Sequence, residues 1–185
     1  MMITLTGFMG GGKTTVGRLL ADALGCPFMD LDDLVVKKAG KSIPDIFAQD
    51  GEPAFRQLEA QVLRKTVEKY AESPAVLALG GGTVLAPASA ALLHEKTVCI
   101  YLRATLDTLL ARLEGKTAGR PLLQEIPDQV GDDGGSIVMP GPDRASVSAR
   151  LASREPIYEE TAHVIIDTDG LSPDEVADEI IISAL

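Results

Sequence analysis

The chain has 185 residues, of which 45% are hydrophobic and 24% are charged, and this suits one globular domain with its own core. Its 17 Lys and Arg against 27 Asp and Glu give a formal net charge of −10. Nucleic acid and anionic membranes bind basic faces, so this balance argues against both as the main partner. We therefore expect a single domain over residues 1–185, with no nucleic-acid or membrane partner.

The sequence also indicates where the protein works. The longest uncharged stretch, 73–93, is interrupted by three glycines and two prolines, which a membrane-spanning helix would not carry. The start of the chain has no basic leader or small-residue cleavage site, so we expect no secretory signal. Cys26 and Cys99 are too few for a disulfide framework, and two thiols are typical of a reducing compartment. We therefore predict a cytoplasmic protein.

Short apolar runs alternate with longer amphipathic segments, which predicts a parallel sheet covered by helices. In chain order we expect a strand over 2–6, a helix over 13–24, a short strand before Asp30, helices over 31–39 and 53–71, a strand over 75–79, a helix over about 87–94, a strand over 97–102, helices over 106–114 and 143–160, a strand over 163–167 and a helix over 173–184.

One segment, 125–143, differs in composition from the rest. It holds three prolines, four glycines and five acidic residues, with no Lys or Arg. Such a composition does not sustain a helix or a strand, so we predict a mobile loop. An acidic segment would be repelled by bound phosphates, so we expect it to stay outward from any nucleotide, as a tolerated surface insertion without a function of its own.

Residues Gly7 to Thr14 match the phosphate-binding pattern G-x-x-x-x-G-K-S/T, and they follow a predicted strand and open a predicted helix. Glycines let backbone N–H groups approach phosphate oxygens, and the helix directs its positive end to the same place. The pattern predicts nucleotide binding by Gly10, Gly11, Gly12, Lys13, Thr14 and Thr15. Lys13 would reach the β- and γ-phosphates, and the Thr14 hydroxyl would bind Mg²⁺.

This loop does not by itself distinguish GTPases, motor ATPases and small-molecule kinases. The chain has no N-K-x-D or D-x-x-G signature for guanine, and it is short for a motor. Asp30 and Asp32 follow a predicted strand, where ligands bind in such folds. One carboxylate could hold a water of the Mg²⁺ shell and the other a substrate hydroxyl. The alternative is that Asp30 only caps the next helix.

Further motifs follow in order: Ser42 to Phe47, Gly51-Glu52, Phe55-Arg56 with Glu59, Leu79 to Gly82, Arg120 to Leu123 and Arg154 to Tyr158. This set, together with the phosphate loop and the two aspartates, resembles the shikimate kinases over nearly the whole chain. The resemblance implies a three-layer α-β-α P-loop fold of the nucleoside monophosphate kinase type, with a five-stranded parallel sheet. It also implies Mg²⁺-dependent phosphorylation of the 3-hydroxyl of shikimate by ATP.

The resemblance further implies roles for individual residues. Lys13, Asp32 and Arg120 match catalytic positions, with Asp32 a candidate base and Arg120 reaching over ATP from a lid within about 115–143. Asp30 and Thr14 match the metal side. The substrate side is matched by Asp32, by Arg56 and Arg154 for the carboxylate, and by Gly80, Gly81 and Gly82, with substrate-binding helices over about 31–60. Arg112 and Pro173 fall where the family holds adenine, and a complete site in one chain favours a monomer.

The residues themselves, apart from the resemblance, also favour carboxylate binding by the arginines. A small carboxylate is best held by forked guanidinium groups. Glu59 follows Arg56 by three residues on one predicted helix, so the acid can hold the guanidinium in place. The alternatives are an exposed helical ion pair for Arg56, and a solvated face for Arg150 and Arg154, which lie four positions apart.

Two features depart from the family pattern. The separation of Arg120 from Arg154 is long, with the excess in 125–143, and Leu171 stands where relatives often have a basic residue before the adenine segment. Three rival functions stay open: a gluconate kinase-like sugar-acid kinase, a nucleoside monophosphate kinase, and a non-catalytic ATP-binding module.

Overall fold

The computed structural model describes residues 1–117 and 144–184. The predicted loop over 125–143 and Arg120 lie outside the described residues. Within the described part, no helix is long and apolar enough to cross a bilayer. Both cysteines are free, Cys26 being partly buried and Cys99 fully buried.

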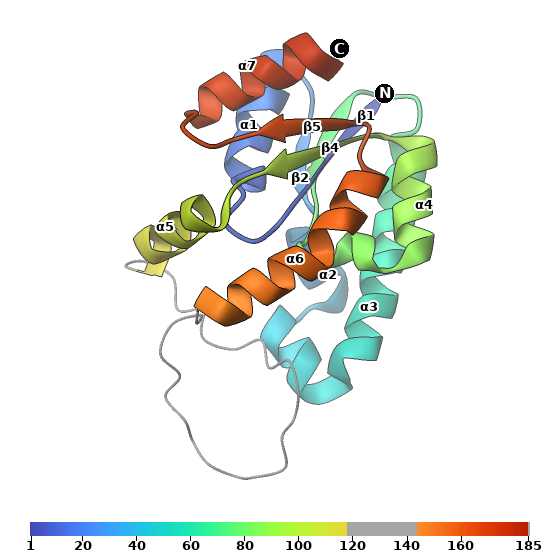
Figure 1. The fold of residues 1–185 in the computed structure, drawn as a ribbon. Helices are drawn as coiled ribbons and strands as arrows, with labels where there is room; N and C mark the ends of the chain where they lie inside the picture. Colours follow the sequence, from blue (N-terminus) through green and yellow to red (C-terminus); the bar gives the residue numbers. More distant parts are fainter. Residues whose placement is uncertain (118–143, 185) are drawn as a thin grey trace.

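Five parallel strands form the centre of the molecule (Figure 1). They are β1 (Met2–Thr6), β2 (Phe28–Asp30), β3 (Ala75–Ala78), β4 (Val98–Arg103) and β5 (Val164–Asp167), in the order β2-β3-β1-β4-β5. All residues of β1 and β3 are buried, as expected for central strands covered on both faces. The predicted five-stranded parallel sheet is confirmed.

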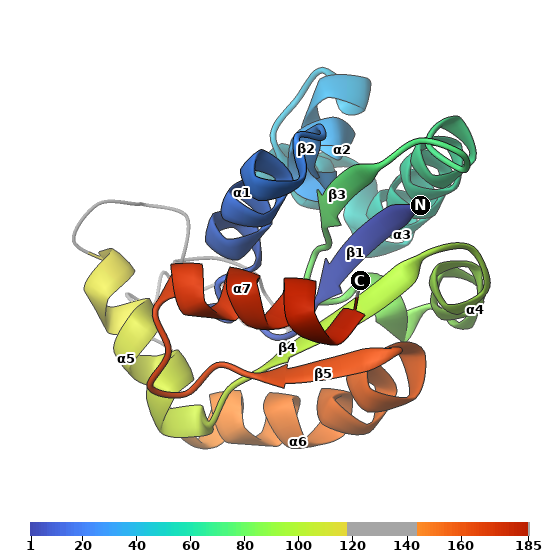
Figure 2. The ribbon, with the colours of Figure 1, turned by 90° about the horizontal axis from the view of Figure 1, so that it is seen from above.

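Helices cover both faces of this sheet, as Figure 2 shows. On one face, α1 (Lys13–Leu24) packs against α7 (Pro173–Ala184) over a core that includes Leu20, Ile100 and Ile180. On the other face lie α3 (Ile43–Lys69), α4 (Pro87–Lys96) and α6 (Arg144–Thr161), over a core that includes Leu63 and Tyr158. The remaining helices are α2 (Leu31–Ala39), α5 (Leu106–Thr117) and the short 3-10 turn η1 (Thr83–Leu85). The three-layer prediction is therefore confirmed.

The predicted start of α3 is wrong. The helix begins at Ile43 rather than at residue 53, because Ser42 accepts a hydrogen bond from the backbone N–H of Asp45 and so caps an extra stretch of helix. A kink at Gly51, with φ 80° and ψ 168°, then separates the two stretches. Gly51 and Pro53 carry the signal of a helix start, and this conceals the short helical stretch before them.

Because the strands are parallel, their C-terminal ends all lie at the same end of the sheet. The loops after β1 and β3 and the start of α2 leave the sheet at this end, and in register Leu5 lies beside Ala78 and Ala78 beside Asp30. Segments that are far apart in the sequence, with the phosphate loop, the aspartates and the three glycines, therefore meet there.

Candidate active site

The phosphate loop connects β1 to α1. Gly12 precedes the helix in the left-handed region, with φ 86° and ψ 5°, a conformation that favours glycine. The side chain of Lys13 turns back over the loop, where Nζ donates to the carbonyl oxygens of Gly7 at 2.7 Å and Phe8 at 3.0 Å. The loop thus places its ammonium group and the N-terminus of α1 around one space, an arrangement suited to phosphate oxygens.

Thr14 and Asp30 meet beside this loop. The Thr14 hydroxyl donates to Asp30 Oδ2 at 2.9 Å, and Asp30 Oδ1 accepts from the backbone N–H of Asp32 at 3.1 Å. Asp30 is therefore the N-cap of α2, and its second oxygen faces the phosphate loop. The cap uses Oδ1, so it leaves Oδ2, the oxygen beside Thr14, compatible with the predicted metal role. A hydroxyl and a carboxylate oxygen are ligands that Mg²⁺ accepts.

Asp32 lies in the first turn of α2, and its environment changes its acidity. Burial raises the pKa of this carboxyl to about 6, with further increases from the negative charges of Asp30 and Glu59, while the Lys13 ammonium lowers it. A methyl group built at Gly80 would lie 3.1 Å from both Asp32 Oδ1 and Glu59 Oε1, so both acids border this glycine. A carboxyl with a pKa near neutrality can accept a proton during a reaction.

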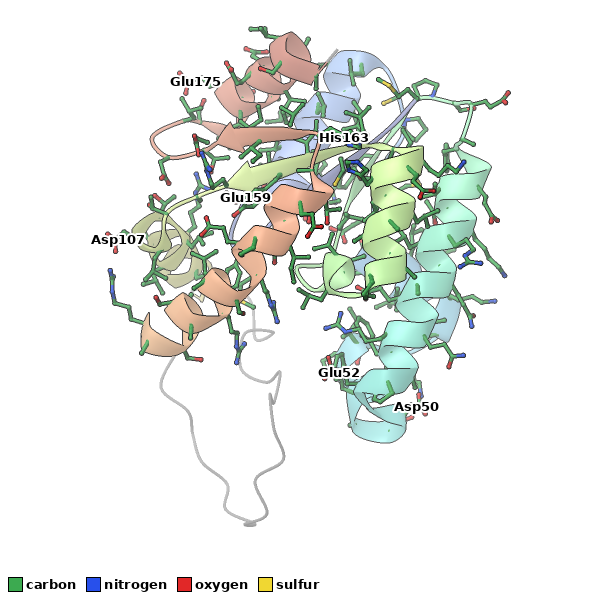
Figure 3. All side chains as sticks on the ribbon, turned by 45° about the vertical axis from the view of Figure 1, so that its right-hand side comes forward. Asp50, Glu52, Asp107, Glu159, His163 and Glu175 are labelled. Carbon is green, nitrogen blue, oxygen red and sulfur yellow. The ribbon has the colours of Figure 1, made fainter. Side chains whose placement is uncertain are left out.

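The guanidinium of Arg56 is held in place by the buried carboxylate of Glu59. Its Nη1 donates to Glu59 Oε2 at 3.0 Å, and Glu59 Oε1 accepts from the Thr83 hydroxyl at 2.8 Å. Glu59 is only 4% exposed, so the pair is not the exposed helical ion pair considered as the alternative. Nε of Arg56 also contacts Glu52 at 3.3 Å, which Figure 3 labels beside the kink of α3. The guanidinium is therefore fixed before any substrate arrives.

The glycines after β3 lie directly against these groups. A methyl group built at Gly82 would come within 2.8 Å of Arg56 Nη2, and at Gly81 within 3.8 Å of the Tyr158 hydroxyl. On α6, Arg154 lies one turn before Tyr158, interacts with its hydroxyl, and is 5.9 Å from the centre of the Phe8 ring. Arg154 thus faces the inner side of the molecule, which contradicts a purely solvated face.

A second part of the site lies on the α7 side of the phosphate loop. A pocket of about 230 Å³ is lined by glycines 10 to 12, Thr15 and Val16, together with Arg112, Thr168, Leu171, Pro173 and Val176. Arg112 donates from Nη1 to the Thr168 hydroxyl at 3.0 Å and from Nη2 to its carbonyl at 2.9 Å. Arg112 and Pro173 are therefore brought to one pocket with the phosphate loop, and Leu171, which stands where related sequences often have a basic residue, lines the same pocket.

Sequence reasoning missed three contributors to this site. Thr83 bonds Glu59, Thr168 holds Arg112, and Tyr158 bonds the carbonyl of Gly81. Only Tyr158 carried a signal, because its spacing of four residues from Arg154 places both on one helix face. The partners of the two threonines are 24 and 56 positions away in the chain, so no local pattern marks them.

Comparison with known proteins agrees with this geometry. The family model for shikimate kinase matches residues 9–184. A shikimate kinase of Salinibacter ruber is 43% identical over 91% of this chain and 78% of its own, and one of Enterococcus faecalis is 39% identical over 97% and 95%. The structure of shikimate kinase from Acinetobacter baumannii in complex with shikimate superposes with a TM-score of 0.80, at 33% identity over 97% of this chain and 90% of that one. The chain belongs to the shikimate kinase family.

Proposed function

We propose that this site transfers the γ-phosphoryl group of ATP to the 3-hydroxyl of shikimate, giving ADP and shikimate 3-phosphate, a step of aromatic amino acid biosynthesis. The observation that carries the proposal is the Arg56 guanidinium, which buried Glu59 fixes at 3.0 Å against the glycine loop that faces the phosphate-binding loop. A pre-oriented guanidinium suits a small carboxylate. Its position next to a nucleotide site supports an acid as the phosphoryl acceptor.

Phosphoryl transfer needs alignment and charge neutralisation more than covalent chemistry. The N–H groups of the phosphate loop would bind the phosphates, and the Lys13 ammonium, which rests on the carbonyls of Gly7 and Phe8, would turn to the transferring group. Thr14 and Asp30 would hold Mg²⁺, which neutralises phosphate charge when bound. Arg154 joins Arg56 on the carboxylate, Gly80 to Gly82 line the substrate, Arg120 is the lid arginine, and Arg112 and Pro173 hold adenine.

We place all these roles in one kinase domain that acts as a monomer in the cytoplasm, with substrate-binding helices over about 31–60 and a lid within about 115–143. The support is that α1, α2, α3, α6 and the loop after β3 of a single chain contribute to the site. A gel-filtration mass of twice the 19.5 kDa of one chain, measured at the protein concentration of the activity assay, would contradict the monomer.

Coupled measurement of ADP release separates the proposed reaction from its rivals. With Mg-ATP, release in the presence of shikimate alone supports the proposal. Release with gluconate or AMP instead identifies a sugar-acid kinase or a nucleoside monophosphate kinase. Nucleotide binding with no turnover on any of the three acceptors identifies a non-catalytic module.

Protonation of Asp32 should lower the reaction rate at acidic pH. Only its deprotonated form can take a proton from the substrate hydroxyl, and its pKa is raised to about 6. We therefore expect kcat/KM for shikimate, which reports ionisation of the free enzyme, to fall by about tenfold per pH unit below this value. A pH profile of kcat/KM at saturating Mg-ATP measures it, and a flat profile down to pH 4.5 would remove Asp32 from proton transfer.

The same shift predicts the opposite effect on stability. The pKa of Asp32 in the folded chain, about 6, lies above the usual 3.8, so the folded state binds the proton more tightly and loses stability as pH rises from 4 to 6. The variant Asp32→Asn cannot ionise at this position and therefore lacks this loss. Without ligands at pH 8 it should be more stable than the wild type by about 1–3 kcal/mol, and the gain should vanish below about pH 4.

Gly82→Ala tests the close approach of the loop to the arginine. The backbone at this position, with φ −108°, accepts alanine, but the new methyl would lie 2.8 Å from Arg56 Nη2 and push the flexible guanidinium aside. We expect the KM for shikimate to rise about tenfold, with the KM for ATP and the melting temperature little changed. An unaltered KM for shikimate would mean that the orientation of Arg56 is unimportant.

A further inference from the structure

The glycine loop after β3 is anchored by a tyrosine from a distant helix. Tyr158 lies on α6 and has no solvent exposure, and its ring packs against Tyr101 with 5.1 Å between ring centres. The hydroxyl donates to the carbonyl oxygen of Gly81 at 2.5 Å, across 77 positions of sequence. A buried hydroxyl is costly unless it has a partner, so this bond fixes which way the Gly81 carbonyl points.

The carbonyl of Gly81 belongs to the same peptide unit as the N–H of Gly82. In a trans peptide these two groups point in opposite directions, and the structure has no cis peptide among its described residues. Holding the carbonyl toward Tyr158 therefore directs the Gly82 N–H away from α6. Within the described ranges, neither the Gly81 nor the Gly82 N–H has a hydrogen-bond acceptor in the protein.

Gly82 is also the residue that touches the arginine. Its built methyl position lies 2.8 Å and 2.9 Å from the two terminal nitrogens of Arg56. The Gly82 backbone therefore lies beside the guanidinium, and an N–H turned to this side would give a bound carboxylate or hydroxyl a further partner. Consecutive glycines have no side chains to restrict rotation of this peptide, so an external anchor is needed to keep the N–H on that side.

We propose that Tyr158 is a positioning residue for the phosphoryl acceptor: its hydroxyl holds the Gly81–Gly82 peptide so that the Gly82 N–H faces the substrate oxygen beside Arg56. This inference rests on the proposed function, and it adds a residue with no contact to the substrate itself. Burial raises the pKa of the Tyr158 hydroxyl, which keeps its proton available for this bond.

Helix α6 also carries Arg154, the second arginine proposed to bind the substrate carboxylate. Arg154 precedes Tyr158 by one turn, and its charge acts on the tyrosine hydroxyl. Tyr158 thereby joins Arg154 on α6 to the glycine loop, and through Gly82 to Arg56 on α3. A shift of the tyrosine hydroxyl would disturb the acceptor side, while the phosphate loop and the Arg112 pocket have no direct contact with it among the described contacts.

The test compares Tyr158→Phe with Tyr101→Phe. Both remove one hydroxyl from the same buried ring pair, but only Tyr158 bonds the glycine loop. For Tyr158→Phe we expect the KM for shikimate to rise about five- to tenfold, with the KM for ATP within about twofold of wild type. Tyr101→Phe should leave both KM values near wild type. Thermal melting of both variants checks that folding is intact.

An activity-independent measurement completes the test. In ¹⁵N-labelled protein without ligands, the Gly82 amide should shift or broaden in Tyr158→Phe and not in Tyr101→Phe, because the peptide is released only in the first. An unmoved Gly82 amide, unchanged shikimate KM, or equal losses for shikimate and ATP would each overturn the proposal. If wild type does not phosphorylate shikimate, the proposed function fails separately, and the amide shift still decides whether Tyr158 holds the peptide.

Discussion

Lys13→Ala is expected to lower kcat by about 10³-fold while the protein keeps its fold. The ammonium group is the one positive side chain that the phosphate loop itself carries, and negative charge develops on the leaving phosphate oxygens in the transition state. In the ligand-free chain, Nζ rests on the carbonyls of Gly7 and Phe8, so it lies in the loop before nucleotide arrives. Single-turnover phosphoryl transfer at saturating Mg-ATP and shikimate measures the loss.

Two variants make this result specific. Lys96→Ala removes an exposed lysine at the end of α4, away from the loop, and should leave kcat unchanged. Lys13→Arg keeps the charge but presents a broad planar group, and we expect it to recover less than a tenth of the wild-type rate. Full activity in Lys13→Ala would show that backbone amides and metal suffice to neutralise the phosphates.

The sequence predicted the parts of the site that depend on local pattern. The predicted bounds of β1 and α1 agree with the structure, because a continuous apolar run and a glycine stop define them. The link of Arg56 to Glu59 was also predicted, since a spacing of three residues on a helix is itself a geometric statement. Its burial was not, because burial depends on Thr83 and the loop after β3, which approach from another part of the chain.

Asp30 illustrates what pattern alone leaves undecided. Helix capping and metal binding were competing interpretations of one carboxylate, but its two oxygens serve Asp32 N–H and the Thr14 hydroxyl separately. A carboxylate has two acceptor atoms, so the observed cap does not exclude the predicted metal role, which stays a prediction. The orientation of the Gly81 carbonyl was equally beyond the sequence, since it depends on a tyrosine 77 positions later.

Arg56→Ala is expected to raise the KM for shikimate about 100-fold and leave the KM for ATP within about twofold. The substitution removes the guanidinium from the site, while the pocket around Arg112 and Pro173, the proposed adenine site, is not lined by Arg56. The variant should also lose stability, because Glu59, 4% exposed, keeps only the Thr83 hydroxyl as a partner. Steady-state kinetics with each substrate varied, together with thermal melting, measure both effects.

Two further arginine variants separate binding from stability. Arg64→Ala removes an exposed arginine two turns later on α3 and should change neither KM. Arg56→Lys keeps a positive charge near Glu59 and should restore most of the melting temperature, yet the KM for shikimate should stay about tenfold high, because an ammonium cannot offer two parallel N–H donors to a carboxylate. If Arg56→Lys restored shikimate affinity together with stability, charge alone would explain the site. The fixed guanidinium geometry would then have no role in recognising the acid.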